Sequence, residues 1–203
     1  MIFNRIVYST SSAALVARYD ASGVKVSTYW RRDEVTPTRK EIKSHYIGEQ
    51  LHLCCYCGLP DPSTHGLDWD VEHIVPQAKH PEFMFTGVNL AVACRECNMN
   101  KGAKETLVDP STSAYPSASD AFHVVHPHFD EWPEHILRDH LTFASFTDKG
   151  AWTIKECNLN RFSGRQIGLR YPISDTRYEE QVRLFLGGDV TLQQIASQLW
   201  TGP

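Results

Sequence analysis

Two pairs of cysteines set the strongest constraint on how this chain can fold. The pairs are Cys54-x-x-Cys57 and Cys94-x-x-Cys97, with 36 residues between them. Each Cys-x-x-Cys turn presents two thiolates on one side of the backbone, and two such turns complete the tetrahedron that Zn²⁺ prefers. Four thiolates leave no open position for water or substrate, so we expect a structural zinc site at these four residues.

The two remaining cysteines fall outside this pattern. Cys55 has the less common one-residue spacing to Cys57, so Cys54 is the expected ligand. Cys157 is remote in sequence and is expected to be buried in the core. The chain shows neither the pattern of a secretory signal nor a membrane span, which predicts a cytoplasmic protein. In that compartment paired cysteines bind metal more often than they form disulfides.

The stretch between the cysteine pairs contains side chains suited to phosphodiester hydrolysis. It includes Asp70-Val-Glu72-His73-Ile-Val-Pro76, and Asn98 directly follows Cys97, the last cysteine of the second pair. Such hydrolysis needs a base to deprotonate water and a cation to balance the developing charge. The neutral imidazole of His73 can take the proton. The oxygens of Glu72 and Asn98 suit Mg²⁺ or Mn²⁺, which leaves the thiolates to Zn²⁺.

From about Cys54 to Lys104, roughly a quarter of the chain, the sequence resembles the HNH endonuclease family. Three segments carry the resemblance: Glu72-His73-Ile-Val-Pro76, Asn89-Leu90 and Cys94-Arg-Glu-Cys97-Asn98-x-x-Lys101-Gly102. The resemblance implies a ββα-metal fold, one catalytic divalent ion, and hydrolysis to 5′-phosphate and 3′-hydroxyl ends.

The resemblance also implies a role for each side chain. His73 is the general base, and Asn98 is a ligand of the catalytic ion. Asn89 does not touch the metal but holds the His73 loop by hydrogen bonds. Lys101 and Arg95 are expected to contact the scissile or a flanking phosphate.

The acidic positions depart from the family pattern. Many members carry Asp or His where this chain has Glu72. Asp70 stands two residues earlier and would share the face of Glu72 on a strand. We expect a structural or outer-shell role for Asp70, with a role as second or replacement metal ligand as the alternative. Asn98 can also cap the helix that follows, and this does not exclude metal binding.

Local patterns predict an α+β fold. A helix is expected to start near Thr36, strands at 69–75 and 90–93, and a helix after Cys94 that runs towards Glu105. Gly58 follows the first cysteine pair, where the turn requires a positive φ. The four expected parts are an N-terminal β-rich extension at 1–35, an HNH core with zinc knuckles at 36–108, a linker at 109–119 and a C-terminal α+β extension at 120–203.

The C-terminal extension carries more local expectations. A hairpin is expected from strands at 141–146 and 151–155, and two helices at about 176–186 and 191–200. The segment His126-Pro-His-Phe-Asp130 suggests loop packing, with a metal or phosphate site as the alternative. Together with Cys157-Asn-Leu-Asn-Arg161, it loosely resembles HNH subunits of bacterial anti-phage systems that work beside an ATPase.

The charge balance limits the binding functions open to the chain. It has 20 Lys and Arg against 24 Asp and Glu, a net charge of −4. This argues against a dedicated high-affinity DNA-binding protein, whose surface would be basic. It does not argue against a nuclease, because a divalent ion supplies local positive charge at the phosphate.

Three functions fit these observations. The first is a self-sufficient metal-dependent DNA endonuclease of restriction or anti-phage defence. The second is a latent nuclease subunit that needs an ATPase-type partner. The third is a non-catalytic, zinc-stabilised nucleic-acid-binding module. The first two are favoured because Glu72, His73, Asn89 and Asn98 are all present. One active site cuts one strand, so a double-strand break would need a homodimer or two encounters.

Overall fold

The computed structural model describes residues 2, 4–60, 68–139 and 141–161. The expected helices at 176–186 and 191–200 lie outside the described residues. Short 3-10 turns separate several of the longer elements. The helices and strands, in chain order, are α1 (Thr10–Ala21), α2 (Thr36–Glu49), β1 (Trp69–His73), β2 (Leu90–Cys94), α3 (Arg95–Lys101), α4 (Trp132–His135), β3 (Ile136–Asp139), β4 (Thr142–Ser145) and α5 (Asp148–Glu156).

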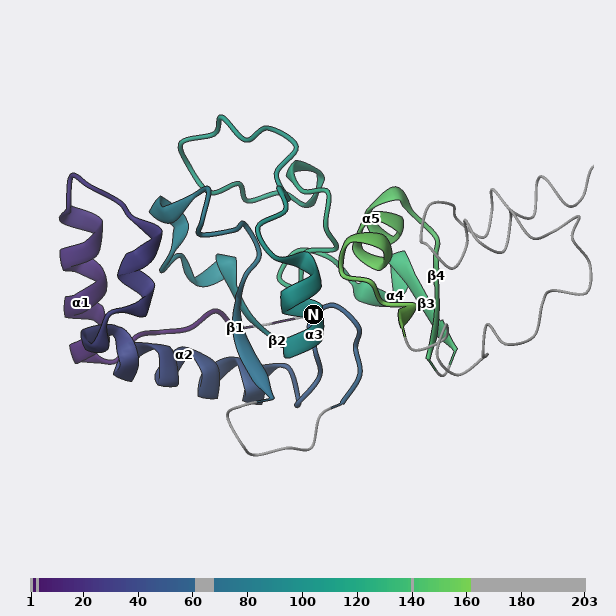
Figure 1. The fold of residues 1–203 in the computed structure, drawn as a ribbon, viewed down its shortest axis with the longest axis horizontal. Helices are drawn as coiled ribbons and strands as arrows, with labels where there is room; N and C mark the ends of the chain where they lie inside the picture. Colours follow the sequence, from purple (N-terminus) through teal and green to yellow (C-terminus); the bar gives the residue numbers. More distant parts are fainter. Residues whose placement is uncertain (1, 3, 61–67, 140, 162–203) are drawn as a thin grey trace, which may run out of the picture.

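The centre of the fold is the antiparallel pair β1–β2, followed at once by α3 (Figure 1). In its register Trp69 lies opposite Cys94 and His73 opposite Leu90. Both strands contact α2 and α3. The expected order of strand, loop, strand and helix is therefore confirmed. The helix stops at Lys101 because Gly102 takes a φ of +52° and ends the α-helical path.

Helix α2 fixes the hairpin from one side. It buries Thr38, Ile42 and Tyr46, which stand four residues apart and so share one helix face. Just after the helix, the side-chain amide of Gln50 pairs with the backbone of Val92. Its Nε2 donates to the Val92 carbonyl and its Oε1 accepts from the Val92 N–H, each at 2.8 Å. The edge of β2 is therefore satisfied without a third strand.

The expectation of a β-rich N-terminus is wrong. Residues 10–21 form helix α1, and 3-10 turns follow at Ser27–Arg31 and Asp33–Val35. Ser9 caps α1, because its side chain accepts a hydrogen bond from the backbone of Ser12. The alternating residues near 24–30 are too few to form a sheet without a partner strand.

The expected hairpin of 141–146 with 151–155 is also wrong. Strand β4 pairs with β3, which precedes it, and the second segment belongs to helix α5. Thr147 caps α5 through a 3.1 Å hydrogen bond from the Gly150 N–H. A Cβ at Gly150 would lie 2.1 Å from the His135 carbonyl oxygen, so this glycine permits close packing rather than a turn.

Residues 109–119 contain no helix or strand apart from the start of a 3-10 turn at Ser119–Ala121. Tyr115 nevertheless packs edge-on against Phe83 at 5.3 Å between ring centroids. A domain boundary at this segment stays a prediction.

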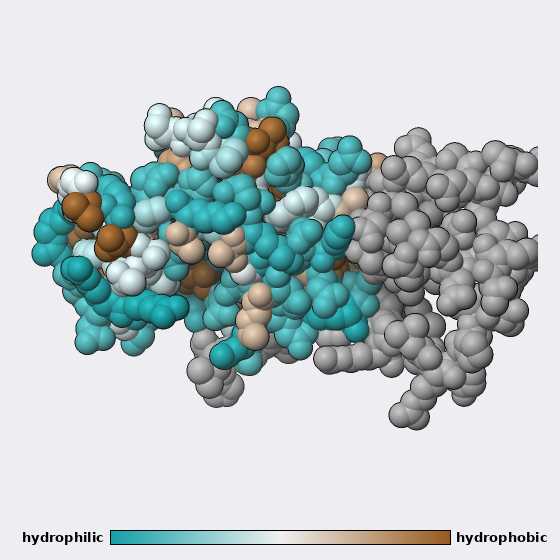
Figure 2. Space-filling view, turned by 45° about the horizontal axis from the view of Figure 1, so that its top comes forward, coloured by the Kyte–Doolittle hydropathy of each residue, from teal (hydrophilic) through white to brown (hydrophobic). Residues whose placement is uncertain are grey.

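Figure 2 shows one face of the molecule that is mostly hydrophilic, with few hydrophobic side chains. Among the described helices, none is long and apolar enough to cross a membrane.

Candidate functional site

Four cysteines meet where the first knuckle, β2 and α3 come together. The Sγ atoms of Cys54, Cys57, Cys94 and Cys97 all lie within 4.8 Å of one another, and only Cys94 is half-buried rather than buried. We call this group the four-cysteine cluster. Gly58 closes the first knuckle with a φ of +61°, as expected. The donor set and its spacing fit a tetrahedral Zn²⁺.

The backbone around the cluster supports this arrangement. The Cys94 N–H donates to Cys54 Sγ at 3.3 Å, which links the two knuckles. The Cys55 N–H donates to the Val92 carbonyl at 3.2 Å and ties the first knuckle to β2. Cys55 and Cys157 lie outside the cluster, and burial raises the pKa of both thiols well above the usual range. The expectation that Cys157 is a buried core residue is confirmed.

His73 ends β1 and is only 6% exposed. Its Nε2 lies 3.0 Å from the Met84 carbonyl oxygen, and the Trp30 and His73 rings pack in a T-shaped arrangement with their centroids 4.6 Å apart. A carbonyl only accepts, so Nε2 carries the proton and Nδ1 keeps its lone pair. No hydrogen bond to Nδ1 is present among the described residues. Burial lowers the pKa of His73 to about 3, which keeps the ring neutral at pH 7.

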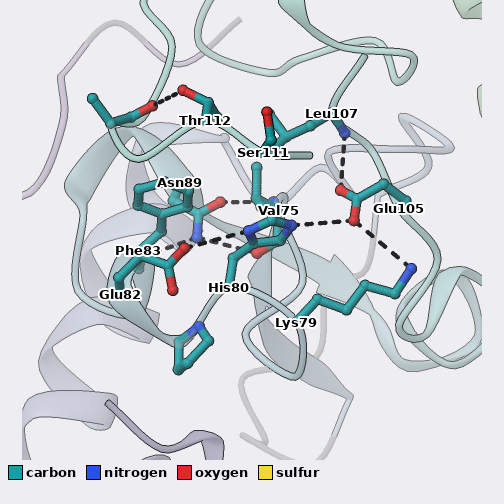
Figure 3. A network of polar contacts seen from close by, with 12 residues as sticks. Val75, Lys79, His80, Glu82, Phe83, Asn89, Glu105, Leu107, Ser111 and Thr112 are labelled. Carbon is teal, nitrogen blue, oxygen red and sulfur yellow. Dashed lines mark hydrogen bonds and ion pairs between the residues drawn. The ribbon is translucent and has the colours of Figure 1, made fainter. Parts of the chain in front are cut away.

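Asn89 holds the loop that follows His73 (Figure 3). Its Oδ1 accepts from the Val75 N–H at 2.7 Å, and its Nδ2 donates to the carbonyls of Val75 and Phe83 at 3.2 and 3.0 Å. Phe83 precedes Met84, whose carbonyl orients His73. These contacts are the ones that a positioning role requires, and the effect of Asn89 on catalysis stays a prediction.

A second polar contact, which sequence reasoning missed, holds the same loop (Figure 3). His80 Nε2 lies 3.1 Å from Glu105 Oε2, and the His80 ring stacks on Phe83. Glu105 also accepts from the Leu107 N–H at 3.1 Å. The loop is therefore anchored to the segment after α3. The pairing joins residues of two separate loops, and no local pattern in the sequence marks it.

Glu72 and Lys101 form a buried ion pair between β1 and α3. Lys101 Nζ is 2.5 Å from Glu72 Oε1 and 2.8 Å from the His73 carbonyl oxygen. The Tyr56 hydroxyl donates to the same carboxylate at 2.9 Å. Burial raises the pKa of Glu72 although Lys101 lies beside it. Lys101 is only 1% exposed, so contact with a phosphate would require its pair with Glu72 to open, and that contact stays a prediction.

Replacing Lys101 with methionine should destabilise the fold strongly, because it leaves the Glu72 carboxylate buried without its cation. We expect a loss of about 3–5 kcal/mol in the free energy of unfolding, measured by urea denaturation. Lys104→Met is the matched control, since Lys104 pairs with Glu156 while remaining 45% exposed. That surface pair should contribute less than about 1 kcal/mol. Equal losses in the free energy of unfolding for the two variants would contradict the burial of the Glu72–Lys101 pair.

Asp70 and Asn98 supply a second pair of oxygen-bearing side chains across the same interface. Asn98 Nδ2 lies 3.0 Å from Asp70 Oδ2, and both residues are half-buried. Among the described residues Asp70 has no ion pair, whereas Glu72 is already neutralised by Lys101. Turning the Asn98 amide about its own axis exchanges its nitrogen and oxygen, so that Oδ1 and the Asp70 carboxylate could bind one ion together. These two side chains therefore fit a hard divalent ion, and Glu72 fits less well as it stands.

The remaining residues considered for a site lie in different environments. Arg95 is exposed on the first turn of α3, and a phosphate contact for it stays a prediction. His126 is fully buried and lies 2.9 Å from the Tyr115 hydroxyl, so its segment serves loop packing. Arg161, which sequence reasoning did not assign to any site, contacts Cys97 Sγ at 3.4 Å. The sequence pattern that could have pointed to Arg161 is the segment Cys157-Asn-Leu-Asn-Arg161, in which it stands four residues after a cysteine.

Comparison with known proteins agrees with this geometry. Residues 54–104 match the model of the HNH endonuclease family. The chain is also similar to Protein ea31 of Escherichia phage lambda, with 27% identity over 134 residues. That alignment covers 64% of this chain and 38% of the phage protein, so the chain spans about two fifths of that relative's length. Residues 54–104 are therefore an HNH endonuclease domain, formed around β1, β2 and α3 and the four-cysteine cluster.

Proposed function

We propose that this protein is a metal-dependent endonuclease that hydrolyses phosphodiester bonds in DNA, with His73 as the general base. The observation that carries the proposal is the contact between His73 Nε2 and the Met84 carbonyl oxygen, which turns Nδ1 into the ring nitrogen that can accept a proton. Burial keeps the ring neutral, the Met84 carbonyl fixes the proton on Nε2, and Nδ1 retains a lone pair. That is the protonation state in which a histidine accepts a proton from water.

In this reaction Nδ1 of His73 takes a proton from water while the water oxygen bonds to the phosphorus. The bond between phosphorus and the 3′ oxygen breaks, and the departing oxygen takes a proton from a second solvent water, which leaves a 5′-phosphate and a 3′-hydroxyl. Asn89 and the backbone of Met84 hold the base in one orientation, so little reorganisation is needed as the proton moves.

The two metals have separate roles in this proposal. Zn²⁺ at the four-cysteine cluster is structural, because all four positions are filled by thiolates. Asp70 and Asn98 would hold Mg²⁺ or Mn²⁺, which supplies positive charge for the phosphate and the leaving oxygen. Glu72 could join them only by giving up its contact with Lys101.

Asp70→Asn should therefore weaken binding of the divalent ion more than Glu72→Gln does. We expect Asp70→Asn to raise the Mn²⁺ concentration needed for half-maximal cleavage by about tenfold or more, from the loss of a carboxylate ligand. Glu72→Gln should mainly lower stability, because it leaves Lys101 buried without its anion. Titrating Mn²⁺ against cleavage rate for both variants checks this. If Glu72→Gln raises the required Mn²⁺ concentration more than Asp70→Asn does, Glu72 is the metal ligand instead.

The function itself is tested by incubating zinc-loaded protein with supercoiled plasmid, with and without added Mg²⁺ or Mn²⁺. We expect conversion to nicked or linear DNA only when the ion is added. Nicked circles before linear DNA would indicate one strand per encounter, whereas direct linear product would indicate a homodimer. Absence of cleavage by folded, zinc-loaded protein with either ion would reject a self-sufficient nuclease.

A second candidate function is a latent nuclease subunit of a restriction or anti-phage system, activated by an ATPase-type partner. The observation that favours it is the covering of His73, which is 6% exposed behind the Trp30 ring. Such a subunit would bind zinc and plasmid but would not cleave on its own. Cleavage restored by a co-purified ATPase would support this version. Binding that never leads to cleavage would support a non-catalytic nucleic-acid-binding module.

A further inference from the structure

Arg161 lies against the four-cysteine cluster although it stands far beyond residues 54–104. Its Nη2 is 3.4 Å from Cys97 Sγ and 3.7 Å from Cys94 Sγ, and its Nε is 2.6 Å from Glu96 Oε2. The side chain is only 7% exposed. A guanidinium presents its N–H groups in a rigid planar fork, so it can donate to thiolates and a carboxylate together.

The chain around Arg161 is attached to α3 and to the residues just after it by further contacts. We call residues 156–161 the return segment, because Asn158 takes a φ of +51° and turns the chain back after α5. Lys104 Nζ lies 2.7 Å from Glu156 Oε2. Asn158 Nδ2 lies 3.5 Å from Asn100 Oδ1. The return segment therefore runs along α3, with the thiolate contacts at its end.

We propose that Arg161 is an outer-shell partner of the zinc-bound thiolates, through which the zinc site holds the return segment on α3. Helix α3 carries both Cys97 and Asn98, so the same contact positions the helix that bears the HNH asparagine. Arg161 is thus a positioning residue, not a catalytic one. The proposal requires a metal at the four-cysteine cluster but not nuclease activity.

The charge of the site explains why an arginine belongs there. Four thiolates carry more negative charge than one Zn²⁺ neutralises, and a buried guanidinium offsets the excess. N–H donors to metal-bound ligands fix their orientation and strengthen the site. Arg138 offers a comparison, because it reaches the other knuckle through the Gly58 carbonyl and not through sulfur. Only Arg161 of this pair should influence how firmly the metal is held.

The test is the rate of zinc release from full-length protein to an excess of a chromogenic zinc chelator. We expect Arg161→Met to release zinc on the order of tenfold faster than wild type, the usual effect of losing an outer-shell partner. Arg138→Met should release zinc at the wild-type rate. Glu96→Gln should change the rate less than Arg161→Met, because it leaves both sulfur contacts in place.

Each outcome decides the proposal. Wild-type release by folded Arg161→Met would overturn it, and so would a wild-type protein that holds no zinc. If Arg161→Met does not fold, Arg161→Lys keeps the charge without the planar fork. That variant should release zinc several-fold faster, and release at the wild-type rate would overturn the proposal. Because the readout is zinc, the result is independent of whether the protein cleaves DNA.

Discussion

Replacing Cys94 with serine is expected to remove zinc from the protein and to destabilise the HNH domain. A serine hydroxyl is a poor substitute for a thiolate, and the three remaining sulfurs do not complete the tetrahedron. Metal binding at such a site contributes directly to folding, by roughly 10–16 kcal/mol in small zinc-binding peptides. Cys94 also links the knuckles through its N–H to Cys54 Sγ. Zinc content should fall from one ion per chain to nearly none, and thermal unfolding should shift to lower temperature.

Cys55→Ala is the matched control for this variant. Cys55 is buried and directly follows Cys54 in the sequence, but it lies outside the cluster. Its thiol, with a pKa well above the usual range, is expected to stay neutral. The control should keep its zinc and lose about 1 kcal/mol from the smaller side chain. Stoichiometric zinc in Cys94→Ser, or equal zinc loss in Cys55→Ala, would contradict the assigned ligand set.

The parts of the fold that could be predicted from the sequence are those fixed by short-range chemistry. The spacing of the two cysteine pairs requires two knuckles, and the length between them leaves room for the strand–loop–strand that is found. The N-terminal helix was missed because its signal is weak. Ser9 supplies an ordinary cap, and the nearby alternating residues imitate a strand. The hairpin expected at 141–155 was wrong because the glycine between its strands, Gly150, is required by a tertiary contact, the close approach of the His135 carbonyl.

The candidate site divides in the same way. His73 and Asn89 could be placed from the motif, because a base and the amide that holds its loop belong to one local unit. The Glu72–Lys101 pair could not, since it depends on which face of α3 meets β1. Arg161 could not be placed either, because only the turn at Asn158 returns it to the cluster. Sequence therefore identifies the chemical groups, and packing decides which of them are neutralised inside the fold.

His73→Ala is expected to abolish cleavage while leaving zinc content unchanged. Losing a general base typically lowers the rate by about 10²–10⁴-fold, and no second imidazole contacts the Met84 carbonyl among the described residues. The measurement is plasmid cleavage with Mn²⁺, alongside zinc content and thermal unfolding. His123→Ala is the control, because His123 is exposed and should leave the rate unchanged. Full-rate cleavage by His73→Ala would reject the assignment.

The pH dependence gives an independent check on the same residue. Burial lowers the pKa of His73 from the usual 6.5 to about 3, so the ring gains a proton only towards pH 3. Between pH 8 and pH 6 the base should stay neutral, and the cleavage rate should not fall through this group. In the unfolded chain the ring protonates near its usual pKa, so the contribution of His73 to stability is full above about pH 6.5 and is lost as the pH falls towards 3. If the cleavage rate of the wild type instead falls with decreasing pH, with a midpoint near pH 6.5, His73 must be more open to water during turnover than in the resting fold. That outcome would favour an enzyme in which Trp30 moves away before the reaction.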